Sequence, residues 1–209
     1  FDVDSQMRMS ATFGAHLAGD PRLSVLFAPG SNASTIVGMP NGRTSDTYTG
    51  TDGVSYTGIS DRNIYAQTNP VLRGKDVPMV LQTYAEVEFL LAEMAIREWI
   101  SGGQAKAKEH YDNGVTAAMK MLKQLYPGST AITDAQISAY LTGPGAFKTA
   151  LQWNDAAKAE QWEQAMGEYW KATFLNEYEA YANWRRTDLP TLIPTKHPNS
   201  ETNNQIMRR

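Results

Sequence analysis

The chain has 209 residues and a mass of 23.1 kDa, which is the size of one large domain. Its 42% hydrophobic and 20% charged residues suit a globular protein with a packed core and exclude collagen-like or wholly disordered classes. The net charge of −3 leaves no overall basic field for nucleic acid, and the lack of cysteine excludes disulfides and thiolate metal sites. No apolar run approaches the roughly 20 residues that span a bilayer.

Residues 20–78 are dominated by turn formers. Between positions 31 and 60 there are five glycines and eleven serines or threonines, but the only charged residues are Arg43, Asp46 and Asp52. This composition predicts a loop-rich region with short strands instead of helix. Long loops without regular structure are usually functional or disordered, so we expect a surface here that contacts a ligand.

Residues 78–127 carry a helical period. The first apolar stripe opens after Pro78, ends before the Gly102-Gly103 break and consists of Val80, Tyr84, Val87, Leu91 and Met94. The second stripe consists of Tyr111, Val115, Ala118, Leu122 and Leu125. A short break between two amphipathic helices predicts an antiparallel pair like one tetratricopeptide unit. No second copy follows at the repeat spacing, so no array is expected.

Further helices are expected over residues 133–186, followed by a coil tail over 190–209. Thr133 is placed to cap a helix that runs through Tyr140, and the stretch 158–186 is predicted to be helical again. Aromatic residues at helical spacing belong to the core far more often than to a binding site. We therefore assign three tryptophans of this region to the core: Trp162, Trp170 and Trp184.

Signatures of catalysis are weak. The three histidines, His16, His110 and His197, lie in different regions without partners at metal-ligand spacing, so no metal site is predicted. No phosphate loop, dinucleotide fingerprint or complete nucleophile elbow occurs, so no cofactor is predicted.

Three glutamates of the first long helix are the candidates for carboxylate chemistry: Glu86, Glu88 and Glu93. Glycosidases use two acids about 5 to 10 Å apart, and the helical spacing of these residues fits that geometry poorly. Glu93, flanked by apolar residues, is predicted to be semi-buried and to need a cationic partner. Arg185 and Arg186 are the expected donors of a structural ion pair.

Several motifs, in order, resemble the SusD/RagB family of outer-membrane nutrient-binding lipoproteins. They are Asp20-Pro21-Arg22-Leu23, Gly38-Met39-Pro40-Asn41-Gly42, the segment 84–93, Trp170-Lys171-Ala172, Trp184-Arg185-Arg186-Thr187 and Ile193-Pro194-Thr195-Lys196. The resemblance covers almost the whole chain, although the family often has Arg and Tyr where Lys196 and His197 stand. It implies a mainly α SusD-like fold with one tetratricopeptide-like pair and an irregular region, in which residues 1–209 form the C-terminal portion.

The resemblance also implies a function. Such a protein lies on the extracellular face of the outer membrane, held by a lipid anchor that would lie outside this chain, and captures a glycan or peptide for a SusC-like TonB-dependent transporter. It binds and does not catalyse. Because family members are longer, one apolar face of the helical pair is expected to lack its neighbours.

The binding residues can be proposed only from loop composition. The rings of Tyr48, Tyr56 and Tyr65 can stack on sugar, and planar polar groups that can bind hydroxyls are supplied by Asn41, Arg43, Asp61 and Arg62. Two other functional classes stay open: a helical adaptor that grips a protein, and, less favoured, a carboxylate hydrolase.

Overall fold

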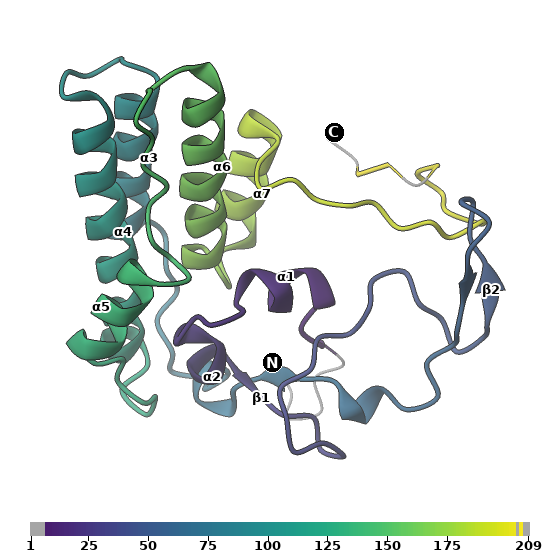
Figure 1. Ribbon diagram of the computed structural model, residues 1–209. Coiled ribbons are helices and arrows are strands. Elements are labelled where there is room, and N and C mark those ends of the chain that lie inside the picture. The colour runs from purple at the N-terminus through teal and green to yellow at the C-terminus, as the bar shows by residue number, and fades with distance from the viewer. Residues whose placement is uncertain (1–6, 204, 207–209) are drawn as a thin grey trace.

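A computed structural model describes residues 7–203, 205 and 206, and over these residues the chain is mainly helical (Figure 1). The helices are α1 (Ala11–His16), α2 (Arg22–Leu26), α3 (Tyr84–Ile96), α4 (Gly103–Leu125), α5 (Asp134–Thr142), α6 (Asp155–Ala172) and α7 (Glu177–Thr187). Two antiparallel pairs of short strands join β1 (Phe27–Ala28) to β4 (Gln67–Thr68) and β2 (Tyr48–Thr49) to β3 (Ser55–Tyr56). Two 3₁₀ turns, η1 (Arg62–Ile64) and η2 (Pro70–Leu72), complete the loop-rich region. The predicted fold class is confirmed.

The helix α3 begins later than predicted, at Tyr84 and not near Pro78. Thr83 and Glu86 form a reciprocal capping box, which satisfies the first backbone N–H groups and sets this start. The predicted buried stripe of α3 is also wrong, because Tyr84 is 64% exposed while Phe89 and Ala92 are fully buried. Apolar residues occur all round this helix, so its period did not single out one face.

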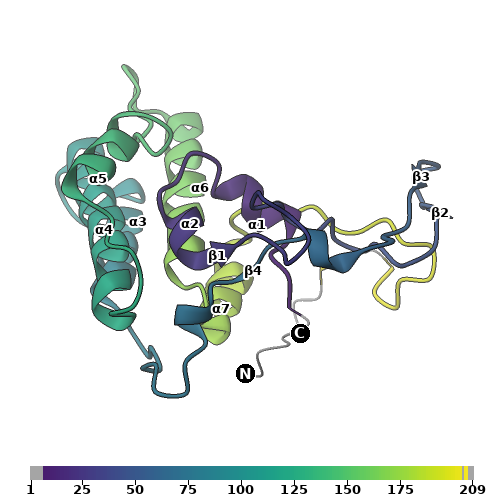
Figure 2. The same cartoon turned by 90° about the horizontal axis from the view of Figure 1, so that it is seen from below.

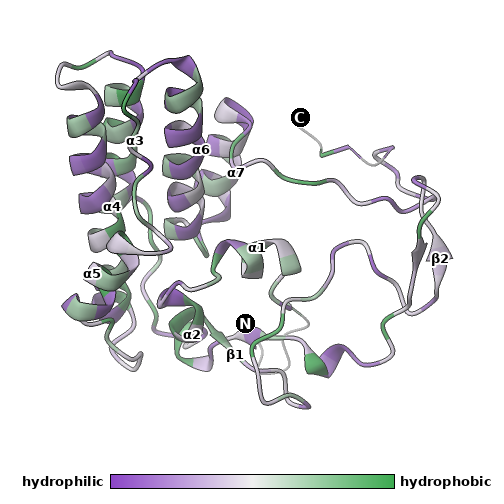
Figure 3. Ribbon diagram, in the orientation of Figure 1, coloured by the Kyte–Doolittle hydropathy of each residue, from purple (hydrophilic) through white to green (hydrophobic). Residues whose placement is uncertain are grey.

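The helix α4 packs beside α3 as an antiparallel neighbour after a short turn (Figure 1). Its predicted stripe is confirmed, since Tyr111, Val115 and Ala118 are buried. Gly114 permits a close approach, because a Cβ there would lie 2.7 Å from Phe89 Cε1. Figure 3 shows hydrophilic residues on the outward side of α4, as expected for a helix that covers a core.

The predicted continuous helix over 158–186 is divided into α6 and α7. Leu175 adopts a positive φ of 70° between them, and Phe174 turns toward Phe13 and Phe27, with ring centroids at 5.3 and 5.0 Å. This aromatic contact joins the α6–α7 turn to α1 and β1. The predicted cap at Thr133 is confirmed, and the described residues beyond 190 form no helix or strand, as predicted.

Two segments project together from the helices: residues 41–60, which contain β2 and β3, and residues 191–203 of the tail. We call these two segments the arm. Figures 1 and 2 show the arm reaching away from the remainder, which we call the helical body. None of the helices in the described part of the chain is long and apolar enough to cross a membrane.

Candidate ligand-binding site

Two of the predicted binding rings face each other in the arm. Tyr48 and Tyr56 are direct partners across β2 and β3, and their rings stack at 5.4 Å between centroids. The Tyr48 hydroxyl donates to the carbonyl oxygen of Gly42 at 2.9 Å. The Tyr56 hydroxyl donates to Asp52 Oδ2 at 2.6 Å, and this bond lowers the pKa of Asp52 and raises that of the phenol.

Each of these rings also has a second partner. The His197 ring lies 4.5 Å from Tyr48, and the Arg43 guanidinium lies 4.4 Å from the centre of Tyr56. The backbone N–H of Thr51 donates to the carbonyl oxygen of Lys196 at 2.9 Å. The Tyr48 ring and the Thr51 backbone therefore tie the hairpin to the tail, and the ring surface left for a ligand is smaller than loop composition suggests.

The other predicted binding residues lie beside η1, outside the arm. Asp61 accepts the N–H of Asn63 and the side-chain amide of Asn32, both at 2.8 Å, so it acts as the cap of η1. Arg62 lies in η1 and is exposed, and Tyr65 is half-buried directly after it. The predicted set thus falls into an arm group and an η1 group.

A cavity of about 430 Å³ lies where the arm meets the helical body, and we call it the Trp170 cavity. Its walls come from the start of α1, the 41–42 loop, α6 and the tail, and they consist of Ser10, Thr12, Asn41, Gly42, Trp170, Leu192, Ile193, Pro194, Thr195, Gln205 and Ile206. Asn41 is the predicted binding residue that lines it. The Asn41 side-chain amide donates to Thr12 Oγ1 at 3.2 Å, which joins the loop to α1.

Sequence reasoning assigned Trp170 wholly to the core, and the structure corrects this. Its ring packs edge-on against Phe13 at 4.9 Å and His16 at 5.2 Å, yet the residue is only half-buried and also lines the cavity. Trp162 is likewise half-buried, whereas Trp184 is 6% exposed and belongs to the core as predicted. Helical spacing gives no sign that one edge of Trp170 remains open.

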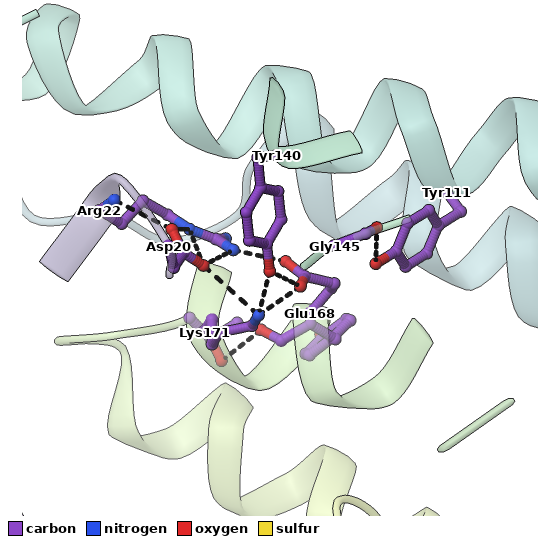
Figure 4. Close-up of polar contacts among 9 residues, drawn as sticks. Asp20, Arg22, Tyr111, Tyr140, Gly145, Glu168 and Lys171 are labelled. Atoms are coloured by element: carbon purple, nitrogen blue, oxygen red, sulfur yellow. Dashed lines mark hydrogen bonds and ion pairs between the residues drawn. The ribbon is translucent and has the colours of Figure 1, made fainter. Parts of the chain in front are cut away.

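Sequence reasoning also missed a cluster of four buried charges, which we call the ion cluster: Asp20, Arg22, Glu168 and Lys171 (Figure 4). Arg22 donates to Asp20 Oδ1 at 2.9 Å and to Glu168 Oε2 at 2.6 Å. Lys171 pairs with Glu168 and donates to the hydroxyl of Tyr140 at 2.7 Å. Two cations thus balance two anions, and the cluster holds the α1–α2 turn against α5 and α6.

The ion cluster keeps its charged state because its members are paired. Burial alone would raise the pKa of Glu168, but the charges of Arg22 and Lys171 outweigh it and lower the pKa to about 2. Burial and the neighbouring Glu168 raise the pKa of Tyr140, so its hydroxyl stays protonated and donates to Glu168 Oε1 at 2.7 Å. This arrangement is structural, since it is closed from solvent and its two cations balance its two anions.

Glu93 is buried, and Arg186 donates to both of its carboxylate oxygens at 2.7 Å. Arg97 approaches the same carboxylate at 2.9 Å. Of the two arginines expected here, Arg186 is therefore the partner, whereas the guanidinium of Arg185 lies 5.8 Å from the Tyr181 ring. The ion pair joins α3 to the end of α7.

The remaining candidate carboxylates also have partners. Glu86 closes the cap of α3, and Glu88 Oε2 lies 2.6 Å from His110 Nδ1, so this histidine has a carboxylate neighbour that its position in the sequence did not suggest. Among the described residues no group of three or more acidic or histidine side chains could hold a metal ion. The glutamates of α3 thus stabilise packing and capping.

Comparison with known proteins finds a family whose profile matches this chain. The profile of a family described as starch-binding and associating with the outer membrane matches residues 3–209. A search of curated proteins finds no significant match. Among solved structures, a chitin-binding protein is 29% identical, with a TM-score of 0.73 over 95% of this chain and 41% of that protein.

Two further structures are similar. The Bacteroidetes AC2a SusD-like protein is 26% identical, with a TM-score of 0.69 over 95% of this chain and 45% of its own. A SusD homologue from Bacteroides fragilis, 24% identical with a TM-score of 0.67, covers 97% of this chain and 44% of its own and supports the fold. The chain spans less than half the length of each of these relatives.

Proposed function

Because this chain belongs to the SusD-like family of starch-binding proteins that associate with the outer membrane, we propose that it captures a glycan at the cell surface. The match over residues 3–209 carries this proposal. The chitin-binding relative supports a saccharide as the ligand class. The family is one of binding proteins and not of enzymes, in keeping with three α3 glutamates that are committed to capping and ion pairs.

We place the glycan on the surface formed by the arm and η1. Its exposed polar groups include Asn41 and Arg62, and Arg43, Asp61 and Tyr65 are half-buried beside them. Tyr48 and Tyr56 contribute as a stacked, half-buried pair. A sugar gains most from ring contact, because its hydroxyls exchange bonds with water at little net benefit.

A SusC-like TonB-dependent transporter is the proposed partner that receives the glycan. The association of the family with the outer membrane supports this role. A lipid anchor would hold the protein to the membrane, and since one acyl chain binds only marginally, contact with a transporter would strengthen attachment. Co-expression with a SusC-like transporter and recovery of a detergent-stable complex would test the partnership.

Glycan binding is tested by calorimetry with starch and chitin oligosaccharides. We expect at least one of Tyr48→Ala, Tyr56→Ala and Tyr65→Ala to weaken binding about tenfold, which is about 1.4 kcal/mol, with no loss of thermal stability. Tyr178→Ala is the matched control, because Tyr178 is 89% exposed on α7, away from this surface.

The possible outcomes separate the alternatives. Equal affinity of all three variants and the wild type would exclude these rings from the site. Binding of peptides without any glycan would change the ligand class, and binding of neither would favour the adaptor function.

A further inference from the structure

We propose that the Trp170 cavity is a subsite for one end of a neutral saccharide, an inference that rests on the proposed glycan-binding function. The cavity volume of about 430 Å³ lies within the roughly 300–1,000 Å³ of small-molecule sites. It is formed by segments far apart in the sequence, and the 41–42 loop of the arm is joined to α1 beside it by the bond from the Asn41 side-chain amide to Thr12 Oγ1.

Trp170 supplies the apolar contact that a sugar ring needs. Phe13 and His16 pack edge-on against its indole and hold the ring in place. Because the ring is already ordered, binding a ligand costs little side-chain entropy. Ile193, which is 77% exposed, and Pro194 add aliphatic surface on the tail side. A pyranose presents CH groups on one face. An indole with neighbouring aliphatic side chains can pack against this face and remove it from water.

The polar groups of the cavity are amides and hydroxyls. Asn41 is oriented by its bond to Thr12, which leaves its carbonyl oxygen able to accept a hydrogen bond from a ligand hydroxyl. The hydroxyls of Thr12 and Thr195 can each donate or accept. Gly42, with a φ of 71°, brings the loop so close that a Cβ would lie 2.7 Å from Thr195, so the 41–42 loop and the tail form one wall.

The absence of charge among the lining residues selects the ligand class. None of the described residues that line the cavity is Asp, Glu, Lys, Arg or His. Burying a carboxylate or a phosphate there would cost free energy without a cationic partner to offset it. A neutral sugar has hydroxyls that match the amide and hydroxyl groups, so malto- or chito-oligosaccharides fit the cavity better than uronates or acidic peptides.

The test measures affinity for neutral di- and trisaccharides of the starch and chitin series, using the variants Asn41→Ala, Trp170→Phe and the cavity-filling Thr195→Tyr. Each is expected to raise Kd tenfold or more. Matched controls are Gln152→Ala, an exposed amide before α6 on the helical body, and Trp99→Phe, a tryptophan that is 63% exposed on the same body. Ligand-induced change in tryptophan emission should persist in Trp99→Phe and vanish in Trp170→Phe, and unfolding midpoints identify any variant that misfolds.

The outcomes distinguish this inference from the function on which it rests. If the wild type binds saccharide and the three cavity variants bind it with unchanged Kd, the subsite is wrong and glycan capture stands. If the wild type binds no saccharide, both are wrong. If oligouronates bind as tightly as neutral sugars and lose affinity in the same variants, the cavity is a site but its assigned ligand class is overturned.

Discussion

The helical body and the arm are held together by different interactions. In the body, apolar side chains of α3, α4 and α6 are buried, and the charges of the ion cluster are closed from water. In the arm, Tyr48 and Tyr56 are half-buried, and their order depends on ring stacking and a few hydrogen bonds. The body thus depends on burial, whereas the arm depends on local contacts between two chain segments.

This difference bears on function. A rigid body with a packed core can hold the loop surface in place, and within the body we expect ligand contact only at the edge that lines the Trp170 cavity. The arm buries little and can adjust around a ligand, which suits capture of an extended glycan. Substitutions in the buried core of the body and in the arm should therefore separate stability from binding.

The largest effect is expected from Glu168→Ala in the body. The substitution removes one of two anions and leaves Arg22 and Lys171 buried with only Asp20 to balance them. Breaking a buried ion cluster in this way should lower the free energy of unfolding by about 3 to 5 kcal/mol. Urea denaturation followed by circular dichroism measures it.

A matched control lies on the same helix. Glu160 approaches Lys148 at 3.9 Å with both side chains more than half exposed, so Glu160→Ala should cost under about 1 kcal/mol. Similar losses for the two variants would show that the ion cluster contributes no more than a surface pair.

Acidification should produce the next largest effect, and again in the body. The pKa of Glu168 falls from an ordinary 4.5 to about 2 on folding, so the stabilisation is fully present above pH 4.5 and is lost as the pH drops toward 2. The loss from this group is on the order of 3 kcal/mol. Unfolding measured at several pH values between 6 and 2 should fall less steeply for Glu168→Gln, which does not titrate, than for the wild type. If the free energy of unfolding fell equally steeply with pH in the wild type and in Glu168→Gln, Glu168 would not be the source of the acid sensitivity.

The sequence predicted features that depend on local pattern. The stripe of α4 is recognisable because polar residues fill its other face, and Thr133 is recognisable as a cap three residues before Gln136. Glu93 could be expected to find an arginine, since a glutamate among apolar neighbours needs one. These are consequences of spacing within one helix or of one residue's chemistry.

Features that join distant segments could not be read in this way. Arg22 and Glu168 are 146 positions apart, and nothing in either neighbourhood points to the other. The Trp170 cavity forms only where α1, α6, the 41–42 loop and the tail meet. Spacing within one helix carries no information about that meeting, so it placed Trp170 in the core. The break between α6 and α7 arises because Phe174 packs on Phe13 and Phe27, a tertiary contact that overrides the helical pattern.

The smallest effect on stability is expected from Tyr48→Ala in the arm. The change removes the stack with Tyr56, the contact with His197 and the hydroxyl bond to Gly42, but it exposes no part of the body core. The free energy of global unfolding should therefore fall by less than about 1 kcal/mol, whereas amide exchange in the arm should accelerate about tenfold or more. Hydrogen exchange read by mass spectrometry resolves this, because the Thr51 N–H, bound to Lys196, reports on the arm and amides of α3 and α4 report on the body. Equal acceleration in α3 and α4 would mean that the arm is coupled to the core, and the contrast between the two regions would then be wrong.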